Sequence, residues 1–310
     1  HNIDVKLRGA DAESSRLQIT QAKSRYLPTL SGYANQSWNI GRGLTSQNTY
    51  ADRNTTNTSL GAQLNLPVFD GLSTPRQVEY AKASLAAALE QFEAAKDDVT
   101  LNVMAAYLQV LYTKELYEVA KHQVDLSDFE LRRQSALLEA GKIPEVDLLE
   151  AESQLAQDKL NMEQADNDWR LALVDLAQLL NLEDISDFDI VPLENSQQYE
   201  VLIQMPEQVY ADALKHNHSV RASRLAVDAA DKYIKVAKTG YIPSLSFNAS
   251  VGSNYYTVSG MNNESFARQL KNNYSTGFGL TLSVPIFDAF QTRNAVRRAK
   301  VQRITAELQN

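Results

Sequence analysis

The sequence predicts a mixed, mainly α-helical fold in which one structural unit occurs twice. It is expected to combine a long antiparallel coiled-coil hairpin with four β-strands of a membrane barrel. Three observations support this prediction. Two ordered motifs recur about 215 residues apart, short segments beside them alternate apolar and polar residues, and a stretch of roughly 65 residues contains neither glycine nor proline. The 310 residues are enough for one large or two ordinary domains.

The repetition is clearest at two proline motifs. Tyr26-Leu27-Pro28 recurs as Tyr241-Ile242-Pro243, and Pro67-Val68-Phe69-Asp70 recurs as Pro285-Ile286-Phe287-Asp288, at offsets of 215 and 218 residues. His1-Asn2 recurs likewise as His216-Asn217. Ordered matches at nearly one offset indicate internal duplication. Only 22 residues follow Asp288, whereas the first copy continues for over a hundred after Asp70, so we expect a C-terminally truncated subunit.

Both repeats are predicted to contain the same elements in the same order. The first repeat, 1–199, comprises a short helix from about residue 10 to 25, strands 29–39 and 58–69, a long helix 74–140 and a return helix 144–181. A polar, acidic connector over 182–206 leads to the second repeat. That repeat, 200–310, comprises a helix 207–239, strands 244–256 and 274–287, and the start of a long helix 290–310. Polar loops join the strands, and each short helix ends before its proline because proline disfavours helical geometry in the preceding residue.

The predicted strands have one apolar and one small polar face. The polar face carries no charge over roughly ten residues, which is the span of a membrane strand, and aromatic residues gather at the strand ends as in interfacial girdles. The strands alone leave a half-buried soluble sheet equally possible. Four strands cannot close a barrel, because the smallest bacterial ones have about eight, so we expect an oligomer; three chains supply twelve. The predicted lipid-facing residues are Leu60, Leu64, Leu66, Phe247, Phe278, Leu280 and Leu282.

The longest helix is predicted to form a coiled-coil hairpin with the helix that follows it. Apolar residues recur along both at alternating spacings of three and four, which is typical of a coiled-coil seam, and Asp158 alone interrupts the pattern in the second helix. Gly141-Lys142-Ile143-Pro144 is the predicted tight turn, with glycine ending one helix and proline opening the next. The first short helix is expected to extend the shorter arm end to end.

Several polar residues suggest local roles. Asp70 and Asp288 recur in both repeats, and we expect turn hydrogen bonding before a helix rather than metal binding. Ser73 or Thr74 is the expected N-cap of the long helix, with Pro75 first inside it. His216 and His218 have the spacing of a metal pair, but no third ligand lies nearby, and we predict no metal and no cofactor.

Composition excludes several functions. The formal net charge of −8 and pI of about 5.1 disfavour a nucleic-acid partner. The absence of cysteine excludes disulfides and thiolate chemistry. No nucleophile motif, phosphate loop or metal signature occurs, so we predict no enzymatic activity.

The order of short helix, Tyr-Leu-Pro-Thr-Leu, two strands, Pro-Val-Phe-Asp-Gly and very long helix resembles the TolC family of outer-membrane factors. So does the run from Glu139 to Ala151, with glycine at the tip, Gly141, and aspartate six residues later, Asp147. The resemblance covers essentially the whole chain. It departs from the family at Lys142 and Ile143, where leucine is commoner.

The resemblance implies a homotrimer in the outer membrane of a Gram-negative bacterium, with a twelve-stranded barrel and a helical tunnel in the periplasm. The implied function is a passive export duct for efflux or type I secretion, coupled through a periplasmic adaptor to an inner-membrane RND, ABC or MFS pump. Gly141, Lys142, Ile143 and Pro144 are the implied docking tip for the adaptor. Asp147 is a candidate pore-constriction residue, and its alternative role is to interact favourably with the helix dipole. The competing function is a soluble coiled-coil scaffold without a pore, which the helices alone also permit.

Overall fold

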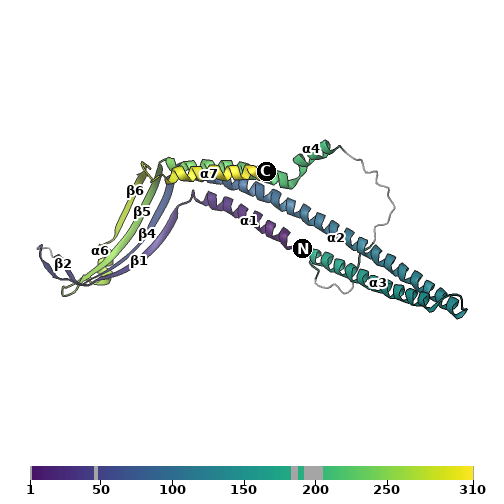
Figure 1. Ribbon diagram of the computed structural model, residues 1–310. Helices are drawn as coiled ribbons and strands as arrows, with labels where there is room; N and C mark the ends of the chain where they lie inside the picture. The colour runs from purple at the N-terminus through teal and green to yellow at the C-terminus, as the bar shows by residue number, and fades with distance from the viewer. Residues whose placement is uncertain (1, 45–47, 183–187, 192–204, 310) are drawn as a thin grey trace. The chain divides into compact units, whose positions relative to one another are not determined.

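The computed structural model describes residues 2–44, 48–182, 188–191 and 205–309 of the chain (Figure 1). Contacts divide the chain into two compact units, one comprising His1–Asp11 and Leu89–Ser219 and the other Ala12–Ala88 and Val220–Asn310. These units do not coincide with the two sequence repeats, because a strand of each repeat pairs with a strand of the other. None of the helices within the described ranges has the length and hydrophobicity needed to cross a membrane.

The second unit is built on a four-stranded antiparallel sheet. Strands β1 (Thr29–Asn39), β4 (Thr55–Phe69), β5 (Ser244–Val258) and β6 (Ser275–Ser283) lie in the order β1-β4-β5-β6 (Figure 1). Strand β4 starts three residues before the predicted strand. Strand β6 ends at Ser283 instead of residue 287, because Ser283 pairs with Ser244, the first residue of β5, and no partner strand continues beyond it.

The loops between the strands contain elements that the sequence did not predict. Strands β2 (Arg42–Leu44) and β3 (Tyr50–Asp52) form a small ribbon between β1 and β4. Helix α6 (Phe266–Asn272) lies between β5 and β6. Its Gln269 side chain donates a hydrogen bond to the carbonyl of Tyr256 and accepts one from the same residue's N–H. Asn263 pairs in the same way with Val258, so side-chain amides satisfy the part of the β5 edge that β6 does not reach.

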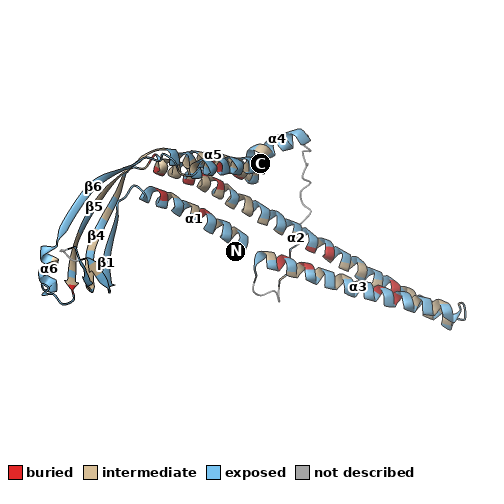
Figure 2. Cartoon of the chain, turned by 60° about the vertical axis from the view of Figure 1, so that its left-hand side comes forward, coloured by how far each residue is buried: buried red, intermediate tan, exposed pale blue. Residues whose placement is uncertain are grey.

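Helices lie beside the sheet in the second unit and form a hairpin in the first. Helix α1 spans Ile3–Ser24, α2 Ser73–Glu139, α3 Glu145–Leu180, and α4 Pro206–His216. Helix α5 spans His218–Lys238, a short 3₁₀ turn covers Thr239–Tyr241, and α7 spans Gln291–Leu308. Many of the buried helical residues are alanines, such as Ala81, Ala229 and Ala299, which allow helices to approach closely. Figure 2 marks the buried positions along the helices in red.

The predicted helix 207–239 is two helices. Asn217 is extended, and its side-chain oxygen accepts a hydrogen bond of 2.9 Å from the N–H of Ser219 at the start of α5. Asn2 caps α1 in the same way, through the N–H of Asp4 at 2.8 Å. The repeated His-Asn pair therefore contributes a helix N-cap in each repeat, and α1 begins at Ile3 rather than near residue 10.

Candidate functional site

The tip of the α2–α3 hairpin is a tight turn with a specific hydrogen-bond pattern. Gly141 has a φ of +68°, and its N–H donates to the carbonyl of Leu138, while the N–H of Lys142 donates to that of Leu137. These two bonds form a Schellman motif, which glycine favours at the left-handed position. The sequence predicts that Pro144 is the first residue of this helix. In the structure α3 begins at Glu145, and Pro144 is its N-cap residue. Gly141, Lys142 and Pro144 are exposed, and Ile143 is half-buried.

Asp147 lies in the first turn of α3, where the helix dipole favours a carboxylate. Its N–H donates to the carbonyl of Pro144, and its side chain is half-buried. Within the described residues, its carboxylate has no hydrogen-bond or ion-pair partner. The position in the first turn agrees with the helix-dipole role, and the pore role stays a prediction.

A buried carboxylate lies farther along the same hairpin. Asp158 is 5% exposed; Ser127 Oγ of α2 donates a hydrogen bond to one oxygen, and Gln154 Nε2 donates to the other at 3.0 Å. The bond from Ser127, with those from Gln154 and Gln123, holds the pKa of the Asp158 carboxyl below its ordinary value although burial acts in the opposite direction. The single interruption of the predicted seam is thus a hydrogen-bonded polar cluster.

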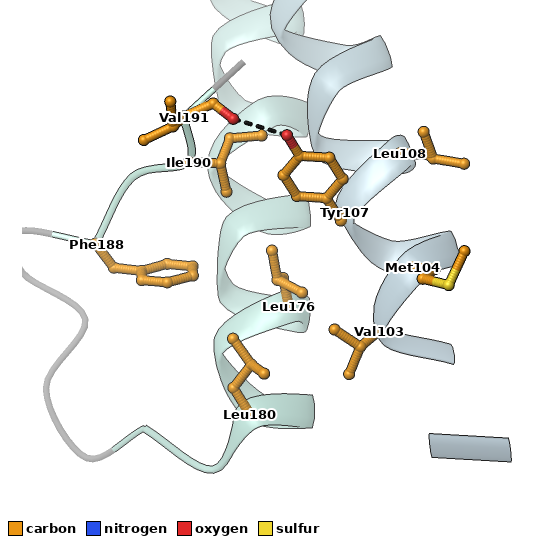
Figure 3. A pocket seen from close by; sticks show the side chains of 9 residues that line it. All are labelled: Val103, Met104, Tyr107, Leu108, Leu176, Leu180, Phe188, Ile190 and Val191. Carbon is orange, nitrogen blue, oxygen red and sulfur yellow. Dashed lines mark hydrogen bonds between the residues drawn. The ribbon is translucent and has the colours of Figure 1, made fainter. Parts of the chain in front are cut away.

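An apolar cavity of about 600 Å³ lies where the segment 188–191 packs on α2 and α3 (Figure 3). Ile190 is buried against Val110 and Leu176, and the Tyr107 hydroxyl donates a 2.7 Å hydrogen bond to the carbonyl of Val191. Lys114 forms an ion pair with Asp189 at 3.3 Å. The rest of the predicted connector, 183–187 and 192–204, lies outside the described residues. Apart from Tyr107, every described side chain lining the cavity is a hydrocarbon or thioether, so these residues bring together no groups for catalysis.

The two faces of the sheet differ in chemistry. Its register places Leu64, Ala249 and Phe278 in one row and Leu66, Phe247 and Leu280 in the next, so all seven predicted lipid-facing residues share one face. On the other face Asn65 donates a 2.7 Å hydrogen bond to Asn248, which donates in turn to Thr281. Tyr33 also lies over Gly61, where an added Cβ would come within 2.6 Å of the Tyr33 hydroxyl oxygen. One face is therefore mainly apolar over the half of the sheet next to the long helices and carries polar residues, such as Gln36, Thr58 and Ser253, farther along, while the other face is an uncharged hydrogen-bonding surface.

The turn from strand to helix is the same in both repeats. Oδ2 of Asp70 accepts a 2.6 Å hydrogen bond from the N–H of Thr74, and Oδ2 of Asp288 accepts one of 2.8 Å from that of Thr292. Hydrogen bonds from Thr292, first from its hydroxyl, lower the pKa of the Asp288 carboxyl. The expectation that Ser73 or Thr74 is the N-cap is therefore wrong. Helix α2 begins at Ser73, and the carboxylate of Asp70 accepts the hydrogen bond from the N–H of Thr74 in its first turn.

The two histidines of the possible metal pair are used differently. Nδ1 of His218 lies 2.8 Å from Oε2 of Glu90, and His216 is exposed at the end of α4. Over the parts of the chain that the structure describes, no cluster of three or more potential ligands is arranged to hold a metal ion.

A duplicated fold with a long helical hairpin and a two-faced sheet is the architecture that comparison with known sequences now identifies. A sequence profile of the outer membrane efflux protein family matches residues 1–182 and 209–309, once in each repeat. The chain therefore belongs to the outer membrane efflux protein family.

Individual relatives agree with this assignment. The chain is 26% identical to the outer membrane efflux protein BepC of Brucella suis over 285 residues, which cover 92% of this chain and 58% of BepC. It is 24% identical to the outer membrane protein TolC of Escherichia coli, covering 99% of this chain and 61% of TolC. The chain thus spans about three fifths of the length of these curated relatives.

Solved structures share the fold. The Campylobacter jejuni CmeC outer membrane channel superposes with a TM-score of 0.82 at 19% identity, covering 99% of this chain and 64% of CmeC. The outer membrane protein VceC of Vibrio cholerae gives 0.79 at 15% identity, covering all of this chain and 71% of VceC. At these identities the similarity establishes the mainly helical, duplicated fold with antiparallel strands.

Proposed function

We propose that the protein is a subunit of an outer-membrane export duct of a Gram-negative bacterium, assembled as a homotrimer and coupled to an inner-membrane pump through a periplasmic adaptor. The observation that carries the proposal is the two-faced sheet. A mainly apolar face suits lipid, and an uncharged polar face suits a water-filled lumen. Export through such a duct is passive, and the chain performs no catalysis.

The edges of the sheet support assembly. Within the described residues, the outer edges of β1 and β6 have no partner strand. Because four strands are too few to enclose a lumen, three copies joined edge to edge would form a twelve-stranded barrel.

The hairpin supports the same assembly. Besides the seam that packs against α3, helix α2 carries a row of apolar residues that is exposed in the single chain. Its members include Leu101, Met104, Leu108, Tyr112, Leu116 and Val119. An exposed apolar stripe of this length marks a surface that further helices cover. We propose that neighbouring hairpins cover it in a helical tunnel, with the tip from Gly141 to Pro144 docking the adaptor and Asp147 facing the constricted pore.

The test is single-channel conductance of the full-length protein in planar lipid bilayers, with recovery from cells as an independent check. We expect discrete conductance steps and a native protein that requires detergent for extraction. Recovery of the native full-length protein from the soluble fraction without detergent would contradict the duct and support the alternative function, a soluble coiled-coil scaffold.

A further inference from the structure

Charge is divided very unevenly between the two compact units. The unit of His1–Asp11 and Leu89–Ser219 contains 11 basic and 29 acidic residues, a formal charge of −18. The unit that contains the sheet has 19 basic and 9 acidic residues, a formal charge of +10. In an acidic chain, an excess of bases in the unit that contains the sheet favours a partner of negative charge.

Five of these 19 bases lie at the four junctions between the sheet and helices α1, α2, α5 and α7. At each junction an exposed aromatic residue lies in the strand or within four residues of it, and one or more bases lie in the adjoining helix or directly beside it. From the apolar sheet toward the helices, the order is therefore apolar, aromatic, cationic. The same order of chemistry is found from the hydrocarbon of a bilayer through its interface to the phosphates. The aromatic residues are Tyr26, Phe69, Tyr241 and Phe287, and the nearest bases are Lys23 and Arg25, Arg76, Lys238, and Arg293.

The junction after β6 shows this order in atomic detail. Ile286 is 93% exposed and Phe287 75% exposed, although both are large apolar residues. The Phe287 ring meets that of Phe290 edge to face, with centroids 5.6 Å apart. The Arg293 guanidinium lies 5.7 Å from the centroid of Phe290. Aromatic rings thus lie between the apolar segment that follows β6 and the cation of Arg293. Residues that anchor a protein at a membrane interface show the same order.

Four of these bases are free to bind a ligand. Within the described residues, Lys23, Arg25, Lys238 and Arg293 are exposed and make no ion pair, whereas Arg76 is paired with Glu79. The nearby carboxylates of Asp70 and Asp288 accept hydrogen bonds from helix N–H groups. Both carboxylates keep their negative charge, but within the described residues neither forms an ion pair with these four bases.

Sequence repetition points the same way. Lys23 and Lys238 occupy equivalent positions of the two repeats, as do Lys82 and Lys300.

We propose that Lys23, Arg25, Lys238 and Arg293, with the aromatic residues beside them, form a collar that binds the headgroup phosphates of anionic phospholipid. The lipids would belong to the leaflet nearest the four junctions with α1, α2, α5 and α7. The proposal rests on the proposed function, because it requires the apolar face of the sheet to lie in a bilayer.

The test compares the lipid contacts of two quadruple variants of the full-length protein in phosphatidylcholine vesicles. Spin-labelled phosphatidylglycerol and phosphatidylcholine report how strongly each lipid associates with the protein. For the unmodified protein at low salt we expect a preference of roughly five-fold for phosphatidylglycerol, which corresponds to the attraction of about one base for an anionic headgroup. High salt should abolish this preference, because salt screens the charges. The collar variant, K23Q/R25Q/K238Q/R293Q, should show no preference.

The matched control, K6Q/K159Q/K215Q/K271Q, removes four exposed lysines away from these junctions and should keep the preference. Conductance in phosphatidylcholine bilayers separates the two proposals, because the collar variant should still conduct. A collar variant that retains the preference, or a control that loses it equally, overturns the collar alone. An unmodified protein that neither inserts nor conducts overturns the duct, and the collar with it.

Discussion

At the scale of single residues, the strand-to-helix turn holds consecutive residues in left-handed conformation. In the first repeat these are Gly71 and Leu72, with φ of +67° and +63°; in the second they are Ala289 and Phe290, with φ of +52° and +63°. A residue with a Cβ is disfavoured there by about 1–2 kcal/mol, whereas glycine is not. The second repeat therefore carries strain at Ala289 that the first avoids at Gly71.

We predict that Ala289→Gly raises the free energy of unfolding by about 0.5–1 kcal/mol, since relief of strain exceeds the greater freedom of glycine in the unfolded chain. Urea unfolding in detergent, followed by circular dichroism, measures the change. The reciprocal variant, Gly71→Ala, should destabilise, because its added Cβ would lie 3.1 Å from the Ile242 carbonyl oxygen. Equal stability of Ala289→Gly and the unmodified protein would show that this turn is not strained.

At the scale of elements, the hairpin keeps one carboxylate inside an otherwise apolar seam. A buried polar group of this kind can fix the register of two helices, since sliding would separate Asp158 from Ser127. Asparagine preserves the shape but places an amide N–H₂ against a donor. We predict that Asp158→Asn lowers the free energy of unfolding by about 1–2 kcal/mol at pH 7.

The pH dependence of this difference follows from the lowered pKa of Asp158. The stability that the carboxylate contributes is present above its unfolded-state pKa, near 3.8, and is lost as pH falls through the lower folded-state value. The gap between Asp158→Asn and the unmodified protein should therefore narrow below pH 4, in urea titrations at stepped pH. Asp125→Asn, an exposed control on α2, should show no such gap. If the difference in the free energy of unfolding between Asp158→Asn and the unmodified protein persists at pH 2, the destabilisation comes from packing and not from the charge.

At the scale of the whole molecule, the proposed trimer gives Asp147 a role that no single chain can show. Three copies around one axis would bring three carboxylates into the constriction, and such a ring binds cations. We predict that Asp147→Asn weakens cation block of the closed channel roughly ten-fold, equivalent to about 1.4 kcal/mol. Multivalent cations titrated against single-channel conductance measure it. Glu145→Gln, in the same helical turn, is the matched control, and unchanged block in Asp147→Asn would leave that residue its helix-dipole role alone.

Much of the fold could be predicted because its signals are local. The alternation along β4, β5 and β6 already shows which residues share a face, and the absence of Gly and Pro between Pro75 and Gly141 marks the long helix. The candidate site is only partly local. Gly141 and Asp147 follow from a turn motif, but the burial of Asp158 against Ser127 and Gln154 depends on how two helices meet. The ribbon β2–β3 and helix α6 were missed, because α6 depends on contacts from Gln269 to β5, 13 residues away.

The amino-acid sequence by itself determined the duplication, the two faces of each strand, the hairpin and its tip, because each depends on neighbours along the chain. Only the tertiary structure decided that β4 of one repeat pairs with β5 of the other, that β6 stops at Ser283, and that the junctions of both repeats lie at one end of the same sheet. The physical reason is that strand pairing joins residues far apart in sequence, where hydrogen-bond geometry and packing, rather than local preference, fix the arrangement.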